Sequence, residues 1–140
     1  MEFRKFGNQY VVRLDRGEEI AASLKKLCRE EDIKLGSIQG LGAADHVNVG
    51  LFDVGTKVYH TKSFDMPMEI TALHGSITRM DGDVYLHIHI CVCDSDFHVF
   101  GGHMNECRIS ATCEIIVTVM DGEVGRKHSE EVGLNLYDFQ

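Results

Sequence analysis

A strictly alternating stretch at residues 86–93 constrains the fold of this chain more than any other feature. Its sequence is Leu-His-Ile-His-Ile-Cys-Val-Cys. Successive side chains of a strand point to opposite faces, so the four aliphatic side chains fall on one face and the two His and two Cys on the other. Alternation over eight residues with this many β-formers predicts a strand.

The polar face of this strand carries a candidate metal site. His87 and His89 lie about 6–7 Å apart at the backbone on one face, so their rings can converge on one ion. Gly101 and Gly102 precede His103 on the expected returning strand, which lets the backbone come close and bring in a third imidazole. Catalytic zinc commonly has three protein ligands and one open position. The alternative, that these His are merely polar residues on a solvated face, stays open on spacing alone.

Other side chains could take part in such a site. Glu69 and Glu114 are acids inside apolar strand patterns. Each could orient a ligand His, act as a fourth ligand, serve as a general base, or simply be a paired or exposed strand acid. Cys91 and Cys93 share the face of the two His and could ligate a soft metal, although a small buried residue is the commoner role of Cys. His74 is a weaker fourth imidazole candidate.

Length and charge restrict the class of protein. The 140 residues favour one domain, residues 1–140, which is large enough for a hydrophobic core. The formal net charge is −8, and the short basic spots at residues 25–26 and 126–128 have acids beside them. Phosphate backbones repel an acidic chain that has no basic patch, so charge gives no support to direct binding of nucleic acid.

The five Cys indicate a reducing compartment. An odd number cannot pair completely within the chain, and no Cys-x-x-Cys motif is present. The first residues lack the apolar core of a secretion signal, and no apolar stretch approaches membrane-spanning length. These features predict a cytoplasmic protein with no membrane partner.

The rest of the pattern predicts several strands and one helix. Strands are expected at residues 10–14, 33–40, 46–53, 57–63, 69–78, 107–120 and 134–139. Apolar residues at helical spacing predict a helix from residue 20 to about residue 31, with a capping box of Asp15 and Glu18 at its start. Gly40 and Gly42 are expected in a tight turn or a close backbone approach, and Pro67 is expected to break the chain. Hairpin-length connections then favour an α+β fold built mainly on antiparallel sheet, with the one principal helix packed on it.

Motifs in a fixed order along nearly the whole chain resemble one known family. They occupy residues 13–14, 17–20, 38–43, 50–53, 68–75, 87–89, 101–104 and 112–115. The most specific of them are the His-Ile-His and the Gly-Gly-His-Met segments. Taken together, they are similar to the PPC (plant and prokaryote conserved) domain family.

The resemblance implies a fold, an assembly and a ligand set. It implies a main antiparallel sheet, a homotrimer, and a metal ion held by His87, His89 and His103. Zinc is the ion that the resemblance favours. Glu69 lies in the segment that matches a Gly-Arg-Phe-Glu-Ile-like stretch of plant members, which is tied there to assembly or partner binding. Residues 66–68, Met-Pro-Met, replace part of that stretch in this chain. Plant members add AT-hook segments that enter the minor groove of DNA, and this chain has no such Arg-Gly-Arg-Pro motif.

Three hypotheses about function follow. The leading one is a cytoplasmic homotrimer that binds zinc or another divalent transition metal. The second is a DNA-binding or DNA-associated regulator, which would need a basic face created by assembly or a DNA-binding partner. The third is a metal-dependent enzyme acting on a small molecule, with Glu69 or Glu114 transferring the proton.

Overall fold

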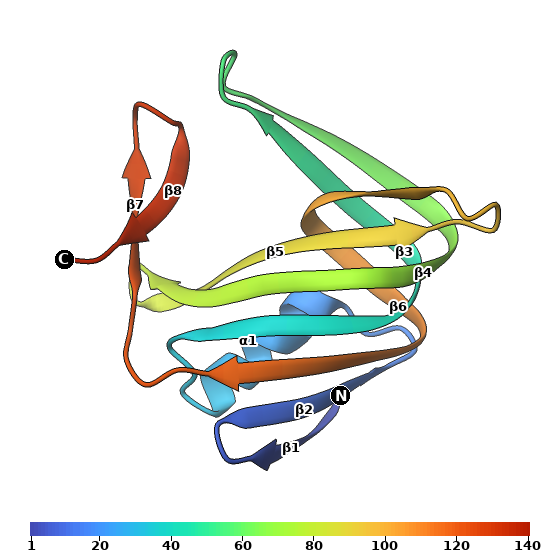
Figure 1. Cartoon of the computed structure of the whole chain (residues 1–140), viewed down its shortest axis with the longest axis horizontal. Helices are drawn as coiled ribbons and strands as arrows, with labels where there is room; N and C mark the ends of the chain where they lie inside the picture. Colours follow the sequence, from blue (N-terminus) through green and yellow to red (C-terminus); the bar gives the residue numbers. More distant parts are fainter.

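The computed structural model describes all 140 residues and contains eight strands and one helix (Figure 1). In chain order these are β1 (Glu2–Phe6), β2 (Gln9–Asp15), α1 (Ile20–Glu30), β3 (Gly36–Asp53), β4 (Val58–Met80), β5 (Asp83–Cys93), β6 (Val99–Val119), β7 (Gly125–Ser129) and β8 (Leu134–Asp138). The predicted class is confirmed: the fold is mainly antiparallel sheet with one helix packed on it.

Six strands form one sheet in the order β1-β2-β6-β3-β4-β5, and β5 also pairs with β6. Strand β6 can make three pairings because it is 21 residues long. Its residues 99–103 pair with β5, residues 103–119 pair with β3, and residues 112–118 pair with β2. Strands β3, β4, β5 and β6 therefore form a closed ring of hydrogen-bonded neighbours, which holds β5 beside the start of β6.

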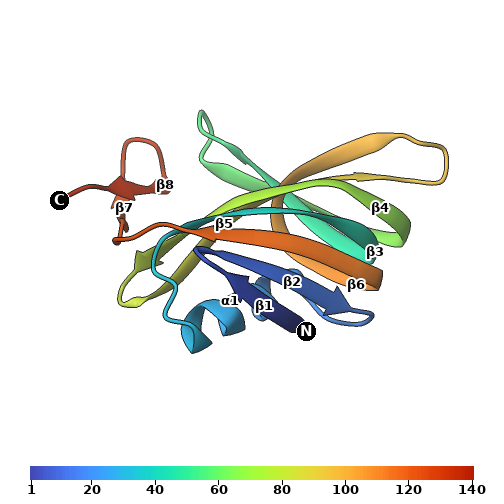
Figure 2. The same cartoon turned by 60° about the horizontal axis from the view of Figure 1, so that its bottom comes forward.

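Helix α1 covers one face of this sheet (Figure 2). It buries Ile20, Leu24, Leu27 and Cys28 and contacts β5 and β6. These side chains belong to one core cluster of 26 buried residues. Burying one large aliphatic side chain contributes about 1.5–3 kcal/mol, so the packing of α1 stabilises the two strands that carry the predicted metal site. No helix here is both long and apolar enough to cross a bilayer.

The predicted capping box at the start of α1 is wrong. Glu19, not Asp15, is the N-cap, and its carboxylate accepts hydrogen bonds from the N–H groups of helix positions 21 and 22. The N–H of Gly17 donates to Ile109 O, and the N–H of Ile109 donates to Glu18 O. These two bonds hold residues 17–18 against β6, so the helix begins only after them.

Strands β3 and β4 are much longer than predicted. The expected strands at residues 33–40 and 46–53 lie in one continuous strand, and those at residues 57–63 and 69–78 lie in another. At Gly42 the predicted close backbone approach is found instead of a turn, since a Cβ there would lie 2.5 Å from Thr112 O. Pro67 does not break β4 because the pairing with β3 skips residues 66–67, so no N–H is required there.

The two ends of the chain add hairpins to this frame. Strand β1, which the sequence pattern did not predict, pairs with β2. The predicted last strand exists as β8, but it pairs with β7 in a separate two-stranded sheet. This β7–β8 hairpin lies at one end of the main sheet, beside the start of β5 (Figure 1).

Candidate metal centre

Strands β5 and β6 bring His87, His89 and His103 together. His89 and His103 are direct partners across the two strands. The ring centroids are 5.1 Å apart for His87–His89, 5.2 Å for His87–His103 and 5.6 Å for His89–His103. One ring nitrogen of each residue lies within 4.8 Å of the other two. The rings of His87 and His89 project from the face of β5 opposite its buried aliphatic face.

Two glycines allow this convergence. A Cβ on Gly101 would lie 2.0 Å from the carbonyl oxygen of Ile90, and a Cβ on Gly102 would lie 2.8 Å from that of Gly50. Strand β6 therefore passes β5 and β3 more closely than any side-chain-bearing residue permits. The close approach predicted from Gly-Gly-His is present, and it sets the position of His103.

The donor set fits a transition metal. In a tetrahedral zinc site the nitrogens lie about 2.0–2.1 Å from the ion, hence about 3.3 Å from one another. Small rotations of the three rings would bring their nitrogens from the present separation, within 4.8 Å, to that distance. Partial burial lowers the pKa of His87 and His103, and the charges of neighbouring imidazoles and, for His87, of Arg126 lower it further. Both shifts favour the neutral ring of His87 and His103, which is the form of imidazole that ligates a metal.

The three imidazoles face a groove of about 810 Å³. Its walls come from β5, the start of β6, the β3–β4 hairpin and the β7–β8 hairpin. The groove is lined by Gly50, Leu51, Phe52, Tyr59, Tyr85, His87, His89, Gly101, Gly102, His103, Asn105, Arg126, Leu134, Asn135, Leu136 and Tyr137. None of these residues is an acid, so the groove has no negative side chain within one copy of the chain.

The sequence reasoning missed three groove residues. Arg126 belongs to the short basic spot at residues 126–128, yet it is half-buried against the rings of Tyr85 and Tyr137. Tyr85 carried a signal that could have been used, because it lies two residues before His87 and so shares its strand face. Nothing local marks Arg126 or Tyr137, since their positions depend on how the β7–β8 hairpin packs.

The structure places the other candidates away from the three imidazoles. Glu69 is exposed on β4 opposite Cys93, which lies roughly 13 Å along β5 from His89. Glu114 is exposed on β6 and is paired in register with β2 and β3. His74 is the direct partner of His89 on β4 but is outside the nitrogen cluster. Neither carboxylate lines the groove.

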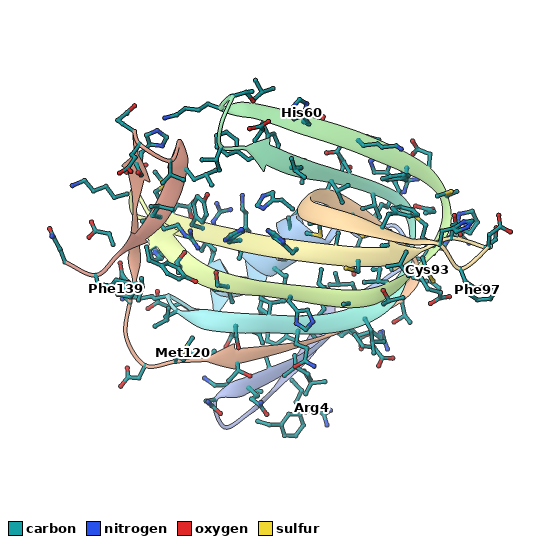
Figure 3. All side chains as sticks on the ribbon, turned by 45° about the horizontal axis from the view of Figure 1, so that its top comes forward. Arg4, His60, Cys93, Phe97, Met120 and Phe139 are labelled. Carbon is teal, nitrogen blue, oxygen red and sulfur yellow. The ribbon has the colours of Figure 1, made fainter.

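Two cysteines and an acidic turn lie at the far end of β5. Cys91 is exposed and Cys93 half-buried at the far end of β5, where Figure 3 labels Cys93, so the small buried role does not apply to them. A second group of possible ligands, Asp94, Asp96 and His98, lies in the β5–β6 turn. Asp94 Oδ1 accepts hydrogen bonds from the N–H groups of Asp96 and His98, which gives this group a structural explanation as a turn.

Comparison with known proteins gives a family and several relatives. The profile of the Plants and Prokaryotes Conserved (PCC) domain matches residues 1–121. A solved structure named a "putative dna binding protein", from Bacteroides thetaiotaomicron, is 36% identical with a TM-score of 0.96, and the match covers 99% of this chain and 96% of that one. A metal-containing protein from Archaeoglobus fulgidus is 30% identical with a TM-score of 0.88, and the match covers 97% of this chain and 96% of that one.

A curated relative matches over part of its length. The bifunctional protein GlmU from a Synechococcus strain is 28% identical over 112 residues, which is 77% of this chain. The chain spans only 16% of the length of that relative.

Proposed function

Because the chain belongs to the Plants and Prokaryotes Conserved (PCC) domain family, we propose that it is a cytoplasmic, homotrimeric metal-binding protein. Its ion, zinc or another divalent transition metal, is held by His87, His89 and His103. The observation that carries the proposal is the convergence of three imidazole nitrogens to within 4.8 Å. The metal-containing relative from Archaeoglobus fulgidus supports it. All five Cys are free, which is typical of a reducing compartment.

An ion held by the three rings would face the groove. When bound there, it could polarise a ligand oxygen or lower the pKa of a water molecule. This is the chemistry that a metal-dependent enzyme acting on a small molecule would use. A proton-transfer role for Glu69 or Glu114 requires that a second copy of the chain bring the carboxylate to the groove, because neither lines it in one copy.

Elemental analysis tests the ligand set. We expect about one ion per chain in the wild-type protein and almost none in His87→Ala, His89→Ala or His103→Ala. His60→Ala is the matched control, since His60 is exposed on β4 and lies outside the nitrogen cluster (Figure 3). Equal metal content in all five proteins would refute the assignment.

An exposed apolar face supports self-assembly. Val11, Leu41 and Ile116 lie on the outer side of β2, β3 and β6 with 45%, 57% and 36% of their surface exposed. Val11 and Ile116 are direct cross-strand partners, and Leu41 lines the same surface hollow. Light scattering of the purified protein should give the mass of a trimer. Leu41→Asp should lower that mass, whereas Val54→Asp, which changes an exposed residue in the β3–β4 turn, should not. A monomeric wild-type protein would refute the assembly.

DNA binding is a second candidate. The observation that favours it is the 36% identical relative from Bacteroides thetaiotaomicron, which carries a DNA-binding name. The net charge of −8 opposes it, so binding would need a basic face formed by assembly or by a partner protein. A mobility-shift titration across salt concentrations decides the matter, because phosphate contacts give a steep salt dependence. No shift at low salt would exclude direct binding.

A further inference from the structure

Arg126 on β7 is held rigidly at the edge of the groove. Its guanidinium carbon lies 4.6 Å from the ring centroids of both Tyr85 and Tyr137. Its Nε donates to Thr78 Oγ1 at 2.8 Å, and its Nη1 donates to the carbonyl oxygen of Asn135 at 2.8 Å. Stacking on two rings and hydrogen bonds from its nitrogens fix the plane of the guanidinium, which has little rotamer freedom left to lose when it binds a ligand.

The charge of Arg126 has no counter-ion. No carboxylate lies within 4.0 Å of its nitrogens, although eight of the chain's salt bridges pair other cationic groups without a His. The groove that it lines contains no acid. A half-buried cation whose partners are all neutral has given up hydration without gaining an opposite charge. An oxyanion would compensate this charge, and a planar guanidinium suits carboxylate and phosphate geometry.

Arg126 is also next to the metal centre. Its Nη2 lies 3.4 Å from Ser76 Oγ, and Ser76 is the direct strand partner of His87. The positive charge of Arg126 accordingly contributes to the lowered pKa of His87. A divalent ion at the three His would add two positive charges to the same groove, with no acidic side chain to offset them.

Three leucines form an apolar part of the groove wall. Leu51, Leu134 and Leu136 keep 65%, 39% and 43% of their surface exposed although they line it. Its volume of about 810 Å³ lies within the range of small-molecule sites. The groove therefore combines a cationic end with an apolar body.

We propose that this groove binds a small anionic molecule whose carboxylate or phosphate pairs with Arg126 and whose apolar part lies against Leu51, Leu134 and Leu136. A further oxygen of the ligand reaches the ion at the three His. This last contact alone rests on the proposed metal site. The pairing with Arg126 does not depend on the metal.

A purely structural role for Arg126 predicts a different behaviour. In that case the residue only fastens the β7–β8 hairpin to β4 through Thr78, and the groove shows no preference for charge. The two roles are separable because a ligand's charge matters only in the first.

Calorimetric titration of metal-free, full-length protein tests the inference. The probes are benzoate, phenyl phosphate and neutral benzyl alcohol, which share an aromatic body. We expect at least one of the anions to bind about tenfold more tightly than the alcohol, the effect of one charge-assisted contact. Whichever anion is preferred identifies the head group. Arg126→Gln should abolish the preference, Arg126→Lys should retain part of it, and Lys127→Ala, the next residue and an exposed cation outside the groove, should leave it unchanged.

The outcomes separate this inference from the metal proposal. Equal affinities of anions and alcohol in the wild type, or an undiminished preference in Arg126→Gln, would overturn the inference. If Arg126→Gln unfolds, the wild type and Arg126→Lys still decide it. The anion preference is measured on metal-free protein, so a failed metal site does not affect this arm. In cobalt-loaded protein the preferred anion should change the visible absorption spectrum, and an unchanged spectrum would overturn the contact with the ion.

Discussion

Replacing Gly101 with Ala tests whether the close passage of β5 and β6 builds the proposed metal centre. The new Cβ would lie 2.0 Å from Ile90 O, whereas ordinary contacts begin at 3.4 Å. Because the obstructing atom is a backbone carbonyl oxygen, which cannot rotate away like a side chain, the two strands must separate locally by about 1.4 Å. Gly125→Ala is the matched control, because that strand glycine has no atom closer than 3.8 Å to the added Cβ and no positive φ.

The expected cost follows from two opposing effects. Inserting a methyl group into a tightly packed site costs about 1–3 kcal/mol. Replacing Gly by Ala restricts the unfolded chain and returns about 0.4–1 kcal/mol. Gly101→Ala should therefore lower the free energy of unfolding by about 1–2 kcal/mol, while Gly125→Ala should leave it equal or slightly higher.

The same separation should weaken metal binding. His89 and His103 are partners two residues from Gly101, and zinc–ligand distances tolerate only about 0.2 Å. We expect the zinc affinity of Gly101→Ala, measured by chelator competition, to fall about tenfold or more. Urea unfolding of the metal-free proteins at matched concentration supplies the stability. If Gly101→Ala equals Gly125→Ala in both measurements, the close passage does not create the site.

Three further changes have defined outcomes. Glu19→Ala should lower the free energy of unfolding in urea by about 1 kcal/mol because α1 loses its N-cap, and Glu19→Gln, which keeps one acceptor oxygen, should lose less. Chelation of the metal should lower the melting temperature of the wild type but not of His89→Ala, since an ion at 100 times its Kd adds about 2.7 kcal/mol; equal shifts would place the ion elsewhere. The hydrogen bond from Arg29, with that from Val84 N–H, lowers the pKa of Asp83 from 3.8 to about 2. This carboxylate therefore stabilises the fold above pH 4, and the contribution is lost as pH falls toward 2. The melting temperature of Asp83→Asn should accordingly fall below that of wild type at neutral pH and match it near pH 2, and a gap that persists at pH 2 would contradict this origin.

Strand β5 and helix α1 could be predicted because their patterns are local. The face on which a strand or helix residue lies depends only on neighbours two to four positions away. His87 and His89 therefore share a face wherever the strand lies, and Leu24 and Leu27 lie on the buried side of α1.

The lengths of β3 and β4 depend on their partners. Both strands contain register shifts, at Gly40–Gly42 and Ala44–His46 of β3, which absorb the glycines and the proline without ending the strand. A bulge forms where the neighbouring ladder has room for an unpaired residue. Because that room is made by residues distant in sequence, the sequence left a turn open as an alternative at Gly40 and Gly42 and predicted a break at Pro67.

The sequence by itself determined that two imidazoles share one strand face and that a glycine pair permits the close approach of a third. The tertiary structure decided that the third imidazole arrives, because the closed ring of strands β3, β4, β5 and β6 places His103 directly beside His89. The tertiary structure alone decided that Arg126 lies beside His87. The two residues are 39 positions apart along the chain, and only the packing of the β7–β8 hairpin brings them together. Spacing along a strand is a property of the backbone, whereas a groove with an unpaired cation exists only where distant segments pack.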